Sequence, residues 1–211
     1  KGADYAFLLN QDAYLQPDTI NKLIKPHKEN KDYGVISPIH LNGKGSKLDN
    51  NFEFYLKQND DLMSDLLCTK LLKPVYKVPF VNAAAWLLPR KTLETVGGFD
   101  PLFFHYGEDD NYCQRVLYHD FKIGVALDTF IYHDRENRSI KVVTTTAEKL
   151  ALRERFLKKE LGNINESTNL DMNKIKQSNF ILMFKLLLKL KFKKARYYFL
   201  ELQMIKKLVI Q

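Results

Sequence analysis

The sequence predicts an α/β fold, with a mostly parallel mixed sheet flanked by helices and a C-terminal helical tail. Apolar runs of strand length alternate with segments of helical periodicity over the first two thirds of the chain. Strands that alternate with helices usually pair in parallel. The 211 residues, of which 45% are hydrophobic and 12% aromatic, also supply enough apolar material for one packed core with an appendage.

The first strands and the first helix follow from short local patterns. Residues 4–10, DYAFLLN, predict a buried strand, and Pro17, Asp18 and Thr19 open a short helix that ends near Pro26. Residues 33–38, YGVISP, predict a second strand. The glycine- and asparagine-rich segment 40–51 predicts a loop.

Two further strands and two helices follow. Residues 74–89, PVYKVPFVNAAAWLLP, predict one long strand or two strands with a kink, and residues 90–98 predict a helix stopped by a glycine pair. Residues 109–121 have helical spacing. Residues 122–134, KIGVALDTFIYHD, return to a strand pattern.

The positive charge is concentrated in the tail. The whole chain carries +8, and residues 173–211 hold ten Lys and Arg against Glu201 alone, a charge of +9 that leaves −1 for the rest. Because the rest of the chain is nearly neutral, the positive charge indicates a binding surface confined to this segment. We therefore expect no nucleic-acid partner.

Cysteine usage and hydropathy predict a cytoplasmic protein. Cys68 and Cys113 are far apart and form no CxxC motif, which fits a reducing compartment. No signal-peptide pattern occurs. The longest apolar stretch, 180–190, is interrupted by Lys185 and Lys189 and is too short to span a bilayer.

Three consecutive acids stand out in the segment FFHYGEDDNYCQR, residues 103–115. Glu108, Asp109 and Asp110 repel one another and are costly to bring near a core. A helix start reduces this cost, because its free amides and its dipole favour negative charge. The acids therefore predict either carboxylates at the rim of an active site or ordinary acids in the first turn of a helix.

Two blocks resemble family 2 glycosyltransferases of the GT-A fold, and in particular their rhamnosyltransferase-like members. The first is YAFLLNQDAYLQPDTINKLI, and the second is VGGFDPLFFHYGEDDNYCQRVLYHDFKIGVALDTFIYHD. The resemblance covers about residues 1–139. It implies transfer of a sugar, with inversion, from a nucleotide-diphosphate donor to a glycan or lipid-linked acceptor.

The resemblance also assigns roles to the acidic residues. It implies that Asp109 is the catalytic base that takes a proton from the acceptor hydroxyl, and that Glu108 shapes the acceptor pocket. It implies that Asp12 and His133 bind a divalent metal, Mg²⁺ or Mn²⁺, which neutralises the diphosphate. The alternatives are an Asx turn around Asp12 and a purely structural histidine.

Other residues are assigned to binding of the donor. Asn10 is expected to meet the donor sugar, while Gln11 stands where the family often has proline. The small residues around Asn82, Ala83 and Ala84, with Trp86 beyond them, resemble the part of the family's strand that lies against the sugar. The alternative is that small residues simply let the strand pack closely.

Basic residues after the last strand complete the donor site that the resemblance implies. Arg135, Arg138 or Lys141 is expected to neutralise the diphosphate. The alternative is a solvated run of charges.

Family members begin with a strand that resembles VIVTYN and with an Asp-rich segment, and together these hold the nucleotide base. Neither pattern occurs in this sequence. The resemblance therefore implies an incomplete GT-A domain over residues 1–140, lacking the nucleotide-binding segment. We expect the 211-residue chain to have little or no transferase activity.

The remaining residues predict helices. Residues 141–172 read as a helical connection and residues 173–211 as a basic amphipathic tail. Apolar residues recur at helical spacing in two sets: Phe180, Phe184, Leu187 and Leu188, then Tyr197, Leu200, Met204 and Leu208. Such a tail suits an anionic membrane surface, a position packed on the catalytic domain, or a homodimer contact.

Two classes of function follow from these observations. The first is a glycosyltransferase of bacterial cell-surface polysaccharide synthesis, on the inner face of the cytoplasmic membrane. The alternative is a non-catalytic GT-A-like remnant that acts as a membrane- or protein-binding module. Manganese-dependent binding of a nucleotide sugar distinguishes them.

Overall fold

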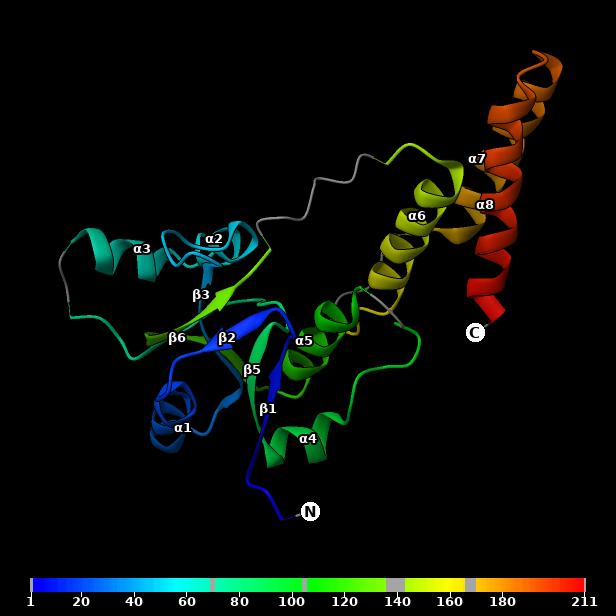
Figure 1. Ribbon diagram of the computed structural model, residues 1–211. Coiled ribbons are helices and arrows are strands. Elements are labelled where there is room, and N and C mark those ends of the chain that lie inside the picture. The colour runs from blue at the N-terminus through cyan, green and yellow to red at the C-terminus, as the bar shows by residue number, and fades with distance from the viewer. Residues whose placement is uncertain (1, 69–70, 104–105, 136–142, 166–169, 211) are drawn as a thin grey trace. The chain divides into compact units, whose positions relative to one another are not determined.

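The computed structural model describes residues 2–68, 71–103, 106–135, 143–165 and 170–210 (Figure 1). The chain forms two compact units. The first comprises residues 1–101 and 108–139, and the second comprises residues 102–107 and 140–211. Each unit is described by itself below.

The first unit is an α/β domain, as the sequence predicts. Its elements in chain order are β1 (Tyr5–Leu9), β2 (Ala13–Leu15), α1 (Thr19–Glu29), β3 (Tyr33–Asn42), α2 (Asn50–Leu56), α3 (Asp60–Leu67), β4 (Val75–Lys77), β5 (Ala85–Pro89), α4 (Arg90–Val96), α5 (Glu108–Tyr118) and β6 (Lys122–His133). The segment predicted as one strand or two, residues 74–89, forms the two strands β4 and β5. The loop predicted over residues 40–51 is shorter than expected, because β3 runs on to Asn42 and α2 begins at Asn50.

The strands form a six-stranded sheet in the order β1-β5-β3-β6-β2, with β4 also paired to β6 (Figure 1). The sheet is mixed, as predicted, but antiparallel pairings outnumber parallel ones in it. Among the described strands, β3 and β6 pair in parallel and the other four pairings are antiparallel. A tight turn follows β1, in which the Ala13 N–H donates to the Asn10 carbonyl at 3.1 Å. β2 then pairs antiparallel with β6 and not with β1.

Helix α1 also differs from its prediction, since it continues through Pro26 to Glu29. Proline removes one hydrogen-bond donor from the helix but keeps its carbonyl, which accepts from the Asn30 N–H at 2.9 Å. Burial of Leu23, Pro26 and His27 holds this turn in place.

Alternate residues of the central strands enter two separate cores on the two faces of the sheet. Val35, Trp86 and Val125 pack with side chains from α2, α3, α4 and α5. Their neighbours Ile36, Leu87 and Ala126 pack with Leu23 of α1. The sheet is therefore covered on both faces, and functional side chains are left to its edges and strand ends.

Close contact between β3, β4 and β6 depends on Gly124. A Cβ atom at this position would lie 2.6 Å from Tyr33 Cε1 and also too close to Val75. We expect Gly124→Ala to lower the free energy of unfolding by about 1–3 kcal/mol, as overpacking does. Urea denaturation measures this, with Gly98→Ala as the control because a Cβ atom added there would meet no described atom within 4 Å. Equal midpoints for the two variants would contradict the prediction.

The second unit consists of the helices α6 (Thr146–Leu161), α7 (Met172–Leu188) and α8 (Phe192–Ile210), so the predicted helical tail is confirmed. Thr145 and Glu148 form a capping box at the start of α6. Arg153 of α6 pairs with the buried carboxylate of Glu201 of α8 at 3.0 Å. Within the described ranges, no helix is long and apolar enough to cross a membrane.

Candidate functional site

Asp12 and His133, which the resemblance assigns to a metal, lie together at the edge of the sheet. Ala13 pairs with His133 across β2 and β6, and the Asp134 N–H donates to the Asp12 carbonyl at 2.9 Å. This pairing brings Asp12 Oδ1 to 3.4 Å from His133 Nε2. The imidazole is 1% exposed, while Asp12 is partly open to solvent.

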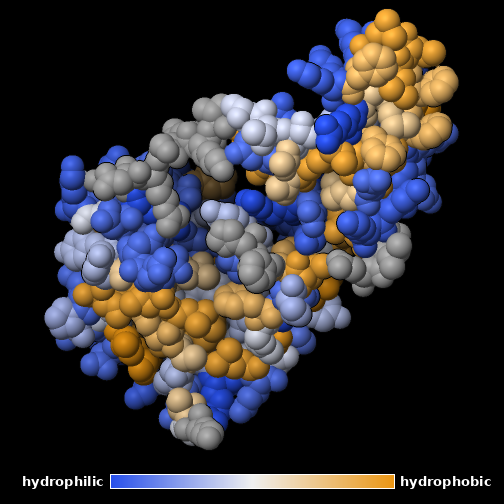
Figure 2. All heavy atoms as spheres, turned by 45° about the vertical axis from the view of Figure 1, so that its right-hand side comes forward, coloured by the Kyte–Doolittle hydropathy of each residue, from blue (hydrophilic) through white to orange (hydrophobic). Residues whose placement is uncertain are grey.

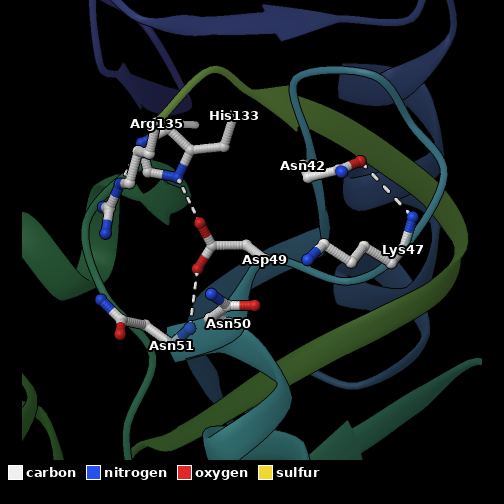
Figure 3. Close-up of a pocket in the computed structure, with 7 residues that line it drawn as sticks. All are labelled: Asn42, Lys47, Asp49, Asn50, Asn51, His133 and Arg135. Carbon is white, nitrogen blue, oxygen red and sulfur yellow. Dashed lines mark hydrogen bonds and ion pairs between the residues drawn. The ribbon is translucent and has the colours of Figure 1, made fainter. Parts of the chain in front are cut away.

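Asp49 approaches the other edge of the same imidazole. Its Oδ2 lies 3.7 Å from His133 Nδ1 (Figure 3). Its Oδ1 caps α2, accepting from the N–H groups of Asn51 at 3.0 Å and Phe52 at 3.2 Å. The sequence analysis missed Asp49 because residues 40–51 read as a loop. An N-cap signal, Asp followed by a helical segment, was present there.

Arg135 fixes the orientation of the histidine further. Its Nε donates to His133 Nε2 at 2.9 Å, so Nε2 acts as an acceptor. The neutral ring then carries its proton on Nδ1, which faces Asp49. A carboxylate facing one ring nitrogen is typical of metal-binding histidines, but here the other nitrogen accepts from Arg135, so a metal at Nε2 would displace that guanidinium.

A pocket of about 400 Å³ opens beside this cluster (Figure 3). It is polar, and both cationic and amide side chains face it. The lining residues are Asn42, Lys47, Asp49, Asn50, Asn51, His133 and Arg135. Of these, His133 and Arg135 were predicted as site residues. Lys47 and Arg135 give the pocket two cations that suit a phosphate-bearing ligand.

Behind His133 lies a second, fully buried histidine, His40. Its ring stacks on Phe52 at 4.3 Å, stands perpendicular to the His133 ring at 6.0 Å, and its Nε2 lies 2.9 Å from Ser37 Oγ. Burial holds the pKa of His40 well below 6.5, and the positive charges of Arg135, and of His133 when that ring is protonated, lower it further. His40 therefore stays neutral and supports the site as a packing residue.

Asp109 and Glu108 begin α5, as the sequence predicts. Asp109 Oδ1 accepts from the Asp110 N–H at 2.9 Å. Burial raises the pKa of Asp109 to about 6, and the negative charges of Asp110 and Glu108 add to this effect. Glu108 Oε2 is buried and has no hydrogen-bond partner among the described residues.

The phenol of Tyr55 in α2 is influenced both by the acids of α5 and by the charges near His133. Burial raises its pKa to about 12, and the charges of Asp109 and Asp110 raise it further. Asp49 acts in the same direction and Arg135 in the opposite one. The start of α5 and the His133 cluster therefore both lie within electrostatic reach of one phenol.

The residues assigned to the donor sugar occupy different environments. The Asn10 N–H donates to the Ala84 carbonyl at 2.9 Å, so the two segments lie side by side. Ala83 is half-buried, and Asn82 is buried with its Oδ1 unbonded among the described residues. Trp86 is fully buried in the core, so contact with a ligand would require its neighbours to move. The binding roles of these residues stay predictions, and Arg138 and Lys141 lie outside the described residues.

Asp12 and His133 form a pair and not a larger cluster. In the described part of the chain, no group of three or more His, Cys, Asp or Glu side chains could hold a metal ion. Asp12 and Asp49 lie on opposite edges of the imidazole, so one ion cannot contact both carboxylates and the ring. A carboxylate with an imidazole suits Mn²⁺ better than Mg²⁺, which takes oxygen ligands, and water and phosphate oxygens would fill the other positions.

No protein-family profile matches the chain, and no curated protein matches its sequence. Among solved structures, the chain is similar to a crystal structure of GalNAc-T7 with UDP, GalNAc and Mn²⁺. The TM-score is 0.49 at 11% identity, over 73% of this chain. The chain spans about a third (32%) of the length of that protein. This likeness is too weak to assign a family or an activity.

Proposed function

We propose that the protein is a metal-dependent glycosyltransferase that uses a nucleotide-diphosphate sugar. One observation carries the proposal. Asp12 and His133, distant in the sequence and chosen from their motifs, have side chains 3.4 Å apart beside a pocket with two cations. A divalent cation held there would offset the charge that develops on the departing diphosphate.

The chain's own residues support three further tasks. Asp49 faces Nδ1 of His133 at 3.7 Å and favours a proton there. Nε2 would serve as the metal ligand once the Arg135 N–H that it accepts from is displaced. Lys47 and Arg135 supply positive charge for phosphate oxygens. Asp109, with its pKa raised to about 6, is suited to accept a proton from a sugar hydroxyl near neutral pH.

The finer assignment depends on the two sequence blocks. We propose an inverting, rhamnosyltransferase-like family 2 enzyme with Asp109 as the base and Glu108 in the acceptor pocket. Asn10, Asn82, Ala83 and Ala84 would contact the donor. The acceptor would be a glycan or lipid-linked precursor of a bacterial surface polysaccharide, at the cytoplasmic side of the membrane.

Mn²⁺ binding by the 211-residue chain tests the proposal without requiring turnover. We expect about 1 mM MnCl₂ to raise the melting temperature of the wild-type chain, because an ion that binds only the folded state stabilises it. Asp12→Asn should lose this shift.

Asp18→Asn is the matched control, because Asp18 is an exposed carboxylate six positions from Asp12 and its side chain caps no helix. It should keep the full Mn²⁺ shift. If Mn²⁺ leaves the wild-type melting temperature unchanged, or if the two variants behave alike, the metal site is wrong. The non-catalytic alternative then becomes the better description.

A further inference from the structure

The turn between α7 and α8 places a large apolar residue in an unusual position. Leu190 has φ of 55°, in the left-handed region. Its N–H donates to the Leu187 carbonyl and the Lys191 N–H to the Leu186 carbonyl, both at 2.9 Å, which is a Schellman motif. Glycine or asparagine usually occupies this position. Here it carries a leucine that is 74% exposed.

Other exposed apolar side chains lie on the two helices close to this turn in the sequence. Phe184 and Leu188 near the end of α7, and Phe192 at the start of α8, are 55%, 72% and 61% exposed. Figure 2 shows apolar surface gathered on the α7–α8 hairpin, with hydrophilic side chains along its sides. Contiguous exposed apolar surface of this kind marks an interaction site.

These side chains do not form the contact between the two helices. On α7 the buried position is Asn179, and Met183 and Leu186, one and two turns further, are half-buried. On α8 the buried positions are Ala195, Glu201 and Ile205. The apolar set Phe180, Phe184, Leu187 and Leu188, predicted as one face of the tail, is instead exposed. These four side chains therefore do not contribute to the packing of α7 against α8.

The charges around the turn identify the partner. Between residues 180 and 199 the chain has no acid, and its bases are Lys185, Lys189, Lys191, Lys193, Lys194 and Arg196. All six are exposed. A second copy of the same tip would bring these like charges together. An anionic lipid surface instead offers apolar acyl chains for the leucines and phenylalanines and negative head groups for the lysines.

We infer that the turn end of the α7–α8 hairpin docks on the surface of an anionic lipid bilayer. Leu188, Leu190 and Phe192 enter the interface, while the flanking lysines contact lipid head groups. This inference is independent of the metal site and of sugar transfer, because all its residues lie in the second unit.

Vesicle co-sedimentation of the 211-residue chain tests the inference. We expect the wild-type chain to bind vesicles of phosphatidylcholine with phosphatidylglycerol at low salt. Binding to pure phosphatidylcholine should be weaker, and high salt should reduce binding to the anionic vesicles. Lys189→Glu with Lys193→Glu should lower the partition coefficient by roughly a hundredfold or more, since each cation near the surface contributes separately.

A second variant tests the apolar part. Leu190→Asn suits the left-handed turn, so circular dichroism should show the helices intact while vesicle binding falls. Lys206→Glu with Lys207→Glu is the matched control, because these exposed lysines lie on α8 away from the turn. The control should bind nearly as wild type does.

Three outcomes would overturn the inference. One is equal binding to neutral and anionic vesicles. Another is a larger loss from the control than from the tip variants. The third is a dimer in sedimentation equilibrium that Leu190→Asn dissociates, without vesicle binding by the wild type, which would assign the tip to a second copy of the chain.

Discussion

Asp109→Asn is expected to make the protein more stable at neutral pH, although it removes the proposed catalytic base. Burial raises the pKa of Asp109 from 3.8 to about 6, so the folded chain holds this proton more tightly than the unfolded chain. Asparagine has a similar shape, stays neutral, and keeps an oxygen that accepts from the Asp110 N–H. We expect a gain of about 1–3 kcal/mol at pH 7 or above.

The pH dependence gives the sign of the effect. Below the unfolded pKa of 3.8 both states are protonated, and the carboxyl group's stabilising contribution is fully present. As pH rises from about 4 to about 6 the unfolded state releases its proton first, so the free energy of unfolding falls, until the folded state also ionises. The variant should therefore match wild type near pH 3.5 and exceed it progressively up to about pH 6 to 7.

Urea denaturation across this pH range measures the difference. Asp128→Asn, which removes an exposed carboxylate of β6, is the control and should change stability by less than about 0.5 kcal/mol. A gain in Asp109→Asn that is the same at low and neutral pH would mean that ionisation of Asp109 is not its cause. Lower stability at neutral pH would contradict the raised pKa directly.

The parts of the fold that the sequence predicted are those with strong local patterns. β1, α4, α5 and β6 follow from an apolar run, a terminal glycine pair, first-turn acids and a long β-branched stretch. Strand direction was not predictable in the same way, because it depends on which strands become neighbours. β1 and β5 pair although most of the first unit's chain lies between them.

The site shows the same division between local and long-range information. Asp12 and His133 were assigned to a metal by the resemblance of their sequence blocks, and pairing of β2 with β6 brings them together. Asp49 was missed because its role depends on the position of His133, which no local pattern near residue 49 contains. Trp86 lies in the core, with its Nε1 unbonded among the described residues, because alternation along β5 directs it inward.

Asp49 both caps α2 and faces His133, and its substitution is expected to weaken Mn²⁺ binding. Asp49→Asn keeps an oxygen that can cap α2 but removes the charge that faces His133 Nδ1. Asparagine caps helices about as well as aspartate, so stability should change by only a few tenths of a kcal/mol. Mn²⁺ affinity should fall by roughly 10- to 100-fold, as it does when a carboxylate behind a metal-binding histidine is removed.

Asp49→Ala removes both roles and should lose a similar factor in Mn²⁺ affinity together with about 1 kcal/mol of stability. The control is Asn59→Ala, because Asn59 caps α3 by accepting from the Leu62 N–H at 2.7 Å, and its other side-chain hydrogen bond goes to the Lys77 carbonyl. It should lose stability and keep Mn²⁺ affinity. Titration calorimetry gives the affinities, and ¹⁵N chemical shifts of the His133 ring report whether its proton stays on Nδ1. If Asp49→Asn binds Mn²⁺ as the wild type does, Asp49 is a helix cap alone, and the ring is oriented by Arg135 and by its pairing with β2.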